Sequence, residues 1–274
     1  MTNIGYVDVP GARLRYEVRG TGPAVLVMGS PMGAAAFAPL ADALAADFTV
    51  VTHDPRGIGG STLADPEQDS TPELRADDAA AILDAIGADR ADVFGSSGGA
   101  VTGLALVERF PGRVRTLVAH EPPLLELLPD AARQRAIVED IIDTFHREGQ
   151  VAAWLKFMIS AGFDLSDEES AGPPPGESSE QDLADSRRFF AHELRGTTRF
   201  RPDLARLTSG PARIVVGIGV DSGGLSTFRT STALAELLGA PPVEFPGDHG
   251  GFMAEPAAFA DKLRQALSIE AVVR

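Results

Sequence analysis

The sequence predicts an α/β fold in which a mostly parallel, twisted sheet is covered by helices on both faces and carries an inserted helical cap. Short apolar, β-branched runs alternate along the chain with Ala- and Leu-rich helical patterns, which is typical of a parallel sheet. A stretch without strand-like runs interrupts this alternation, and 274 residues suffice for one large domain with such an insertion.

The predicted strands are short and apolar. The first two are linked through Pro10-Gly11, so we expect them to form an antiparallel hairpin. In chain order the strands are expected at Ile4–Val9, Leu14–Val18, Ala24–Met28, Phe48–His53, Ala91–Ser96, Val114–Ala119, Arg213–Ile218 and Pro242–Phe245.

Helices are expected between these strands. Thr71 is a predicted N-cap and Gly87 a predicted stop, whereas Pro256 suits the first turn of the final helix. The core helices are expected at Ala34–Ala46, Pro72–Ile86, Gly98–Phe110, Leu225–Leu238 and Pro256–Leu267.

The domain organisation follows from these patterns. Residues 1–121 and 211–274 are expected to form the α/β core, and residues 122–210 the helical cap. The cap sequence predicts helices at Asp130–Arg147, Val151–Ala161 and Asp182–Leu194, and the acidic, proline-rich stretch over residues 164–182 predicts a loop.

Composition excludes several function classes. The formal net charge of −15 disfavours binding to nucleic acids and to anionic membrane surfaces. With no cysteine, disulfides, thiolate metal sites and a cysteine nucleophile are ruled out. Residues 1–10 lack the basic and apolar segments of a signal peptide, so we expect a cytoplasmic protein. A homodimer is compatible with the sequence.

Gly95-Ser96-Ser97-Gly98-Gly99 follows a predicted strand and precedes a predicted helix. This is the G-x-S-x-G pattern in the strand–turn–helix setting that exposes a serine hydroxyl above a sheet. The alternative is a glycine-rich turn without chemistry, but the setting favours Ser97 as a nucleophile.

Two further segments follow strands: Asp54-Pro55-Arg56-Gly57-Ile58-Gly59-Gly60-Ser61 and Gly247-Asp248-His249. Together with the serine turn, they resemble the serine-nucleophile branch of the α/β-hydrolase superfamily over the whole chain except the cap. The resemblance implies that His249 is the general base. It also implies an oxyanion hole made by the backbone N–H groups of Gly98 and Ser30. No cofactor motif appears, and the histidine spacing indicates no metal site.

The acidic partner of His249 is left open between two carboxylates at predicted strand ends. Asp221 follows the strand at 213–218, one residue later than the usual G-x-x-D spacing of the family. Glu121 follows the strand at 114–119, and His120-Glu121-Pro122 is locally similar to the zearalenone lactone hydrolases, in which this glutamate is the acid. We favour Glu121 and keep Asp221 as the alternative.

Trp154, Phe157 and Met158 share one face of a predicted cap helix. They are expected either to pack in the cap or to contact a small apolar substrate. The favoured function is a serine esterase or lactonase that acts on a small or medium-sized apolar ester or lactone through an acyl-enzyme. The alternatives are cofactor-free carbon–carbon hydrolase, perhydrolase, haloperoxidase or cyclase chemistry on the same fold, and, from another class, a ligand-binding receptor-like protein.

Overall fold

A nine-stranded sheet forms the centre of the protein. The computed structural model describes residues 2–164 and 179–268. The strand order is β1-β2-β4-β3-β6-β7-β8-β9, with β5 paired to β2. The strands from β4 to β9 along this order run parallel, whereas β1, β2 and β5 pair antiparallel. Their bounds are β1 Asn3–Val9, β2 Ala12–Arg19, β3 Ala24–Met28, β4 Thr49–His53, β5 Thr62–Leu63, β6 Ala91–Ser96, β7 Val114–His120, β8 Arg213–Gly219 and β9 Val243–Phe245.

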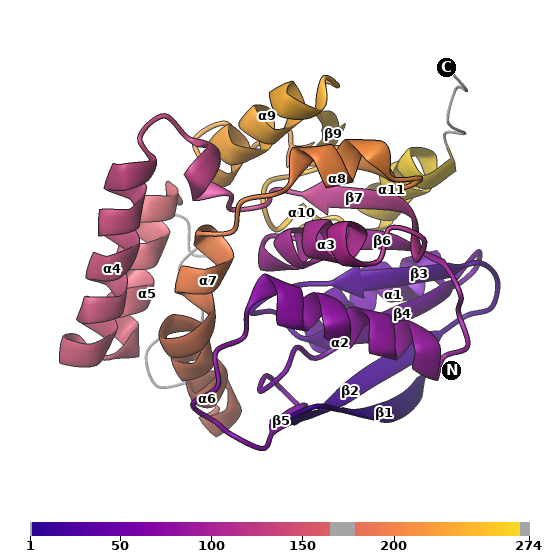
Figure 1. Cartoon of the computed structure of the whole chain (residues 1–274), viewed down its shortest axis with the longest axis horizontal. Coiled ribbons are helices and arrows are strands. Elements are labelled where there is room, and N and C mark those ends of the chain that lie inside the picture. Colours follow the sequence, from indigo (N-terminus) through magenta and orange to yellow (C-terminus); the bar gives the residue numbers. More distant parts are fainter. Residues whose placement is uncertain (1, 165–178, 269–274) are drawn as a thin grey trace.

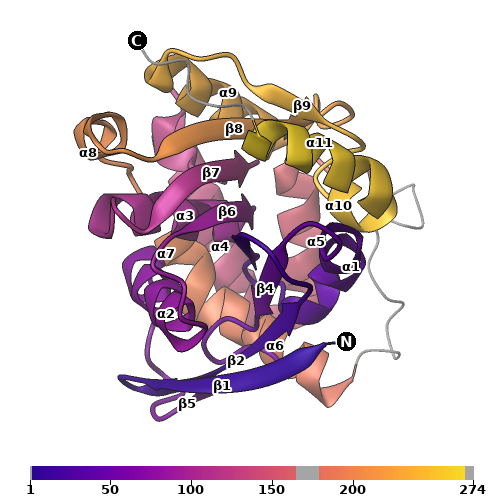
Figure 2. The same cartoon turned by 90° about the vertical axis from the view of Figure 1, so that its right-hand side faces the viewer.

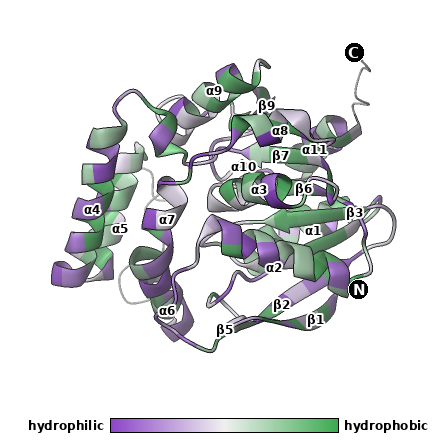
Figure 3. Cartoon of the chain, in the orientation of Figure 1, coloured by the Kyte–Doolittle hydropathy of each residue, from purple (hydrophilic) through white to green (hydrophobic). Residues whose placement is uncertain are grey.

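Helices cover both faces of the sheet (Figures 1 and 2). One apolar cluster joins the sheet to α2 (Pro72–Ala85), α3 (Gly98–Arg109), α8 (Leu204–Ser209) and α9 (Ser226–Leu238). A second cluster lies on the other face, under the 3-10 turn η1 (Ala34–Phe37), α1 (Ala38–Leu44), α10 (Gly251–Ala254) and α11 (Pro256–Ser268). Figure 3 shows the central strands as hydrophobic and the outer helices as mixed. The predicted α/β class with a mostly parallel sheet is confirmed.

The cap has its own apolar cluster, to which Ile141, Phe189 and Leu194 belong. It lies to one side of the sheet in Figure 1. Its elements are the 3-10 turn η2 (Leu125–Leu127), α4 (Ala131–Glu148), α5 (Gln150–Ala161), α6 (Glu180–Arg188), the π-helical turn η3 (Phe189–Glu193) and α7 (Leu194–Thr198).

The structure differs from the expected cap in two places. The helix predicted at Asp182–Leu194 begins at Glu180, capped by Ser179, and widens into η3. In that wider turn Phe189, Phe190 and Glu193 are all buried. The second difference is that Phe200 and Leu207 pack in the cluster of the core, so packing favours an end of the cap before residue 210. The division of the chain itself stays a prediction, and most of the predicted loop, residues 165–178, lies outside the described residues.

None of the described helices combines the length and the apolarity needed to cross a bilayer.

His120, at the end of β7, is fully buried, so its protonation should be linked to stability. Burial lowers the pKa of His120 from 6.5 to about 4. Between these values the unfolded chain binds a proton that the folded protein does not, so the free energy of unfolding decreases as the pH falls. His120→Gln should reduce this pH dependence by about 1.4 kcal/mol per pH unit between about pH 6 and 5. Urea unfolding of both proteins measures the two slopes, and equal slopes would contradict the linkage.

Candidate active site

Ser97 lies on a strained turn between β6 and α3. Its backbone has φ 56° and ψ −124°, a conformation that costs free energy for a residue with a side chain. A Cβ atom on Gly99 would lie 2.2 Å from the carbonyl oxygen of Met28, and one on Gly95 would lie 2.5 Å from the carbonyl oxygen of Gly99. Glycine is therefore required at both positions for strand and helix to meet this closely, and the turn exposes Ser97 above the sheet.

Glu121 is the second residue other than glycine with a positive φ, 49°, among the described residues. It directly follows β7, and its side chain is completely buried. The carboxylate accepts a hydrogen bond from the Gly219 N–H at 2.8 Å and another from the Thr227 hydroxyl at 2.9 Å. Its Oε2 atom lies 2.6 Å from Nδ1 of His249. The structure therefore brings together Glu121 and His249, which lie 128 positions apart in the sequence.

Charge and hydrogen bonding keep Glu121 ionised in this buried position. Burial alone would raise the pKa of the Glu121 carboxyl, but the hydrogen bond and charge of His249 outweigh it and lower the pKa to about 2. When the imidazole is neutral, a carboxylate that accepts from its Nδ1–H fixes the tautomer in which Nε2 is free to accept a proton.

Asp221 does not reach His249 in this arrangement. Its side chain is exposed, and its backbone N–H donates to the carbonyl oxygen of Gly247 at 3.1 Å. Asp221 thus helps to join the loop after β8 to the loop that carries His249, without a side-chain contact to the imidazole among the described residues.

Ser97 and His249 line the same cavity. No hydrogen bond between their side chains is present among the described residues, and such bonds are often long in sites without substrate. Ser97 is instead held through its N–H, which donates to the carbonyl oxygen of His120 at 2.9 Å.

The two residues predicted to supply the oxyanion hole are neighbours. A Cβ atom on Gly98 would lie 2.9 Å from both the Cβ and the carbonyl oxygen of Ser30. Within the described chain, neither backbone N–H donates to another residue, so both are available to a ligand. Asp54 braces this loop from behind, because its Oδ1 atom accepts from the Ala34 N–H at 2.8 Å.

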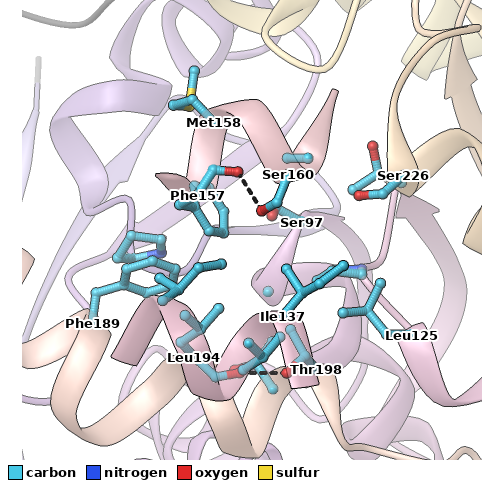
Figure 4. A pocket seen from close by; sticks show the side chains of 18 of the residues that line it. Ser97, Leu125, Ile137, Phe157, Met158, Ser160, Phe189, Leu194, Thr198 and Ser226 are labelled. Atoms are coloured by element: carbon cyan, nitrogen blue, oxygen red, sulfur yellow. Dashed lines mark hydrogen bonds between the residues drawn. The ribbon is translucent and has the colours of Figure 1, made fainter. Parts of the chain in front are cut away.

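The cavity has a volume of about 240 Å³ and lies between the carboxyl ends of the strands and the cap. Trp154, Phe157 and Met158 all line it. Trp154 also stacks on Phe189 with 5.2 Å between ring centroids and donates its indole N–H to Ser186, so packing in the cap and contact with the cavity occur together. Figure 4 shows Phe157 near the centre of the group, Phe189 at its left-hand side and Met158 at its upper margin. Further apolar lining comes from Leu125, Ile137, Val138, Ile141, Phe163 and Leu194.

Several residues of the site carry no recognisable sequence signal. Thr227 and Gly219 hold Glu121, but a threonine at a helix start and a glycine at a strand end are common in any fold. Among the described residues, no group of three or more His, Cys, Asp or Glu side chains is arranged to hold a metal ion.

Comparisons with known proteins show which protein family this chain is similar to. A family model described as the alpha/beta hydrolase fold matches residues 23–153. The uncharacterized hydrolase YraK of Bacillus subtilis is 35% identical over an alignment of 275 residues that covers 98% of this chain and 97% of that protein. A zearalenone hydrolase of Cladophialophora bantiana is 27% identical over 256 residues and 91% of each chain. A solved hydrolase from Pseudomonas aeruginosa superposes with a TM-score of 0.78 at 22% identity, over 97% of this chain and 98% of that one.

The likeness to zearalenone hydrolases is confirmed, and it is wider than predicted. From the sequence it was limited to the segment around Glu121 and did not include the cap. The match covers 91% of the chain, a share that residues outside the cap cannot supply alone. Cap helices with few fixed motifs conceal this similarity from inspection of a single sequence.

A fluorophosphonate probe should test the reactivity of Ser97. The Ser97 hydroxyl is expected to displace fluoride from phosphorus, with its proton passing to His249, and peptide mapping by mass spectrometry should find the adduct at Ser97. Ser96→Ala is the matched control, because Ser96 is fully buried and its loss should leave labelling intact. Equal labelling of Ser97→Ala and the unmodified protein would refute the assignment.

Proposed function

The chain belongs to the alpha/beta hydrolase fold family, and from this premise we propose that it is a serine hydrolase of small or medium-sized apolar carboxylic esters or lactones. The observation that carries the proposal is the buried Glu121–His249 pair, with 2.6 Å between Oε2 and Nδ1, at a cavity that Ser97 also lines. A serine hydroxyl is a weak nucleophile until a positioned base accepts its proton, and this pair supplies such a base.

In the proposed reaction the Ser97 Oγ atom attacks the substrate carbonyl carbon while Nε2 of His249 takes the hydroxyl proton. Glu121 stabilises the imidazolium that forms. The carbonyl oxygen becomes an oxyanion, which the N–H groups of Ser30 and Gly98 stabilise. His249 then gives its proton to the departing alkoxide, and the acyl group stays on Ser97. Water, activated by His249, hydrolyses this acyl-enzyme and regenerates the serine.

The cavity supports the proposed substrate class. Most of its lining is apolar, and its volume of about 240 Å³ lies just below the range of about 300–1,000 Å³ that is typical of small-molecule sites. An apolar acyl or alcohol group would lie against Phe157, Ile137 and Leu194, with the ester carbonyl near Ser97. A lactone places both groups in one ring, and the relative named as a zearalenone hydrolase makes cyclic esters part of the proposal.

Hydrolysis of a series of p-nitrophenyl esters tests this function. We expect turnover of the acetyl, butanoyl and hexanoyl esters and little turnover of the palmitoyl ester, because the cavity is too small for a long chain. Ser97→Ala should lower kcat by at least about 10³-fold, since no other group replaces the nucleophile. A wild-type protein that binds these esters but hydrolyses them no faster than Ser97→Ala would instead behave as a ligand-binding protein, contrary to the proposal.

A further inference from the structure

Two charged side chains are buried where cap and core meet and take no part in the reaction described above. Glu193, at the end of η3, is 1% exposed, and Arg75, in α2, is 2% exposed. Burying a charge is costly unless a partner compensates it. Oε2 of Glu193 lies 3.6 Å from Nη1 of Arg75, so each is the countercharge of the other.

Glu193 is bound directly to one of the two oxyanion residues. The Ser30 hydroxyl donates to Oε2 of Glu193 at 2.7 Å, across 163 positions of sequence. A hydrogen bond to a charged acceptor is stronger than one between neutral groups. This bond anchors the Ser30 side chain to the cap and so restrains the residue whose backbone N–H is assigned to the proposed oxyanion hole.

Arg75 is bound to the other oxyanion residue through one intermediate. Its Nε atom donates to Oγ1 of Thr102 at 3.0 Å, and the Thr102 hydroxyl donates to the carbonyl oxygen of Gly98 at 3.0 Å. Ser30 and Gly98 are therefore the two ends of one buried chain of polar contacts that runs through Glu193 and Arg75.

The same chain of polar contacts is also bound to a second residue of the cap, and it includes a buried polar atom that has no hydrogen-bond partner among the described residues. Nη2 of Arg75 donates to Oγ1 of Thr197 at 2.8 Å, and Thr197 lines the cavity. The second oxygen of Glu193, Oε1, has no hydrogen-bond partner among the described residues. An unpaired buried acceptor costs stability, and π-helical turns such as η3 occur frequently at functional sites. Both observations favour a functional role over a purely stabilising one.

We propose that Glu193 is a positioning residue for the oxyanion hole: with Arg75, it holds Ser30 and Gly98 in the relative placement at which both N–H groups reach the developing oxyanion. This proposal rests on the proposed serine hydrolase function. Arg75 has a second effect, because it neutralises a carboxylate that would otherwise repel an oxyanion nearby. The rate of the chemical step therefore depends on a residue of the cap that touches no substrate.

The test measures kcat and KM for p-nitrophenyl butanoate in Ser30→Ala, Glu193→Gln and the double variant. Ser30→Ala keeps the backbone N–H and removes only the bond to Glu193. Loss of a whole oxyanion donor costs about 10²–10³ in kcat, so misplacement of one should cost about 10-fold or more, with KM nearly unchanged. If both residues act through one contact, kcat of the double variant should be little lower than kcat of the less active single variant.

A trifluoromethyl ketone inhibitor supplies a readout that loss of stability alone would not move. Its carbonyl carbon bonds to Oγ of Ser97, the proton passes to His249, and the carbonyl oxygen becomes an oxyanion in the hole. The inhibition constant should rise in each variant by the same factor as kcat falls. Asp185→Asn is the matched control, because this cap carboxylate accepts from the Gly59 N–H of the core at 3.1 Å without touching Ser30 or Arg75, and it should leave both constants unchanged.

The outcomes separate this proposal from the one on which it rests. A wild-type protein without esterase activity or reaction with the ketone would refute the proposed function itself. If the wild type is active, and both Ser30→Ala and Glu193→Gln keep kcat and the inhibition constant within about twofold of its values, the positioning role alone would be overturned. Additive losses in the double variant would also overturn it. Should Glu193→Gln fail to fold, the comparison of Ser30→Ala with Asp185→Asn still decides.

Discussion

The burial of one carboxylate, that of Glu121, is the constraint on which the arrangement of the site depends. A carboxylate withdrawn from water is stable only with several donors around it. The donors come from three segments: Gly219 at the end of β8, Thr227 in α9 and His249 in the loop after β9. Satisfying this charge therefore fixes the position of the proposed base relative to the sheet. The hydrogen bond and charge of His249 in turn lower the pKa of Glu121 to about 2, against the effect of burial.

Backbone strain is located at the same centre. Ser97 and Glu121, with φ of 56° and 49°, follow the adjacent parallel strands β6 and β7. Residues with side chains occupy this region only where the surrounding structure compensates the cost. The close packing of Gly99 on β3 and the three donors to Glu121 provide that compensation. The cap completes the site from the other side with apolar surface and with Glu193, which pairs with Arg75 of the core helix α2.

The sequence was sufficient to predict the fold class, because hydrophobic periodicity and the serine turn are local signals. It favoured Glu121 through a local likeness alone and left Asp221 open as the alternative, since both follow parallel strands at the same edge of the sheet. Their difference lies in the φ of Glu121 and in the backbone bond from Asp221 to Gly247, which are tertiary features. Glu193 and Arg75 were missed for a related reason. Each is a charged residue within a predicted helix, where solvent exposure is the ordinary expectation for such a side chain, and only the packing of cap on core shows their burial.

The most direct measurement of the central claim is kcat for ester hydrolysis in Glu121→Gln compared with Asp221→Asn. Both substitutions remove a charge and preserve side-chain shape, so they differ only in which carboxylate is lost. If Glu121 orients His249, Glu121→Gln should lower kcat by up to about 10⁴-fold, and Asp221→Asn, a change to an exposed side chain, by less than about 10-fold, or 1.4 kcal/mol. A large loss in Asp221→Asn with little change in Glu121→Gln would contradict the account.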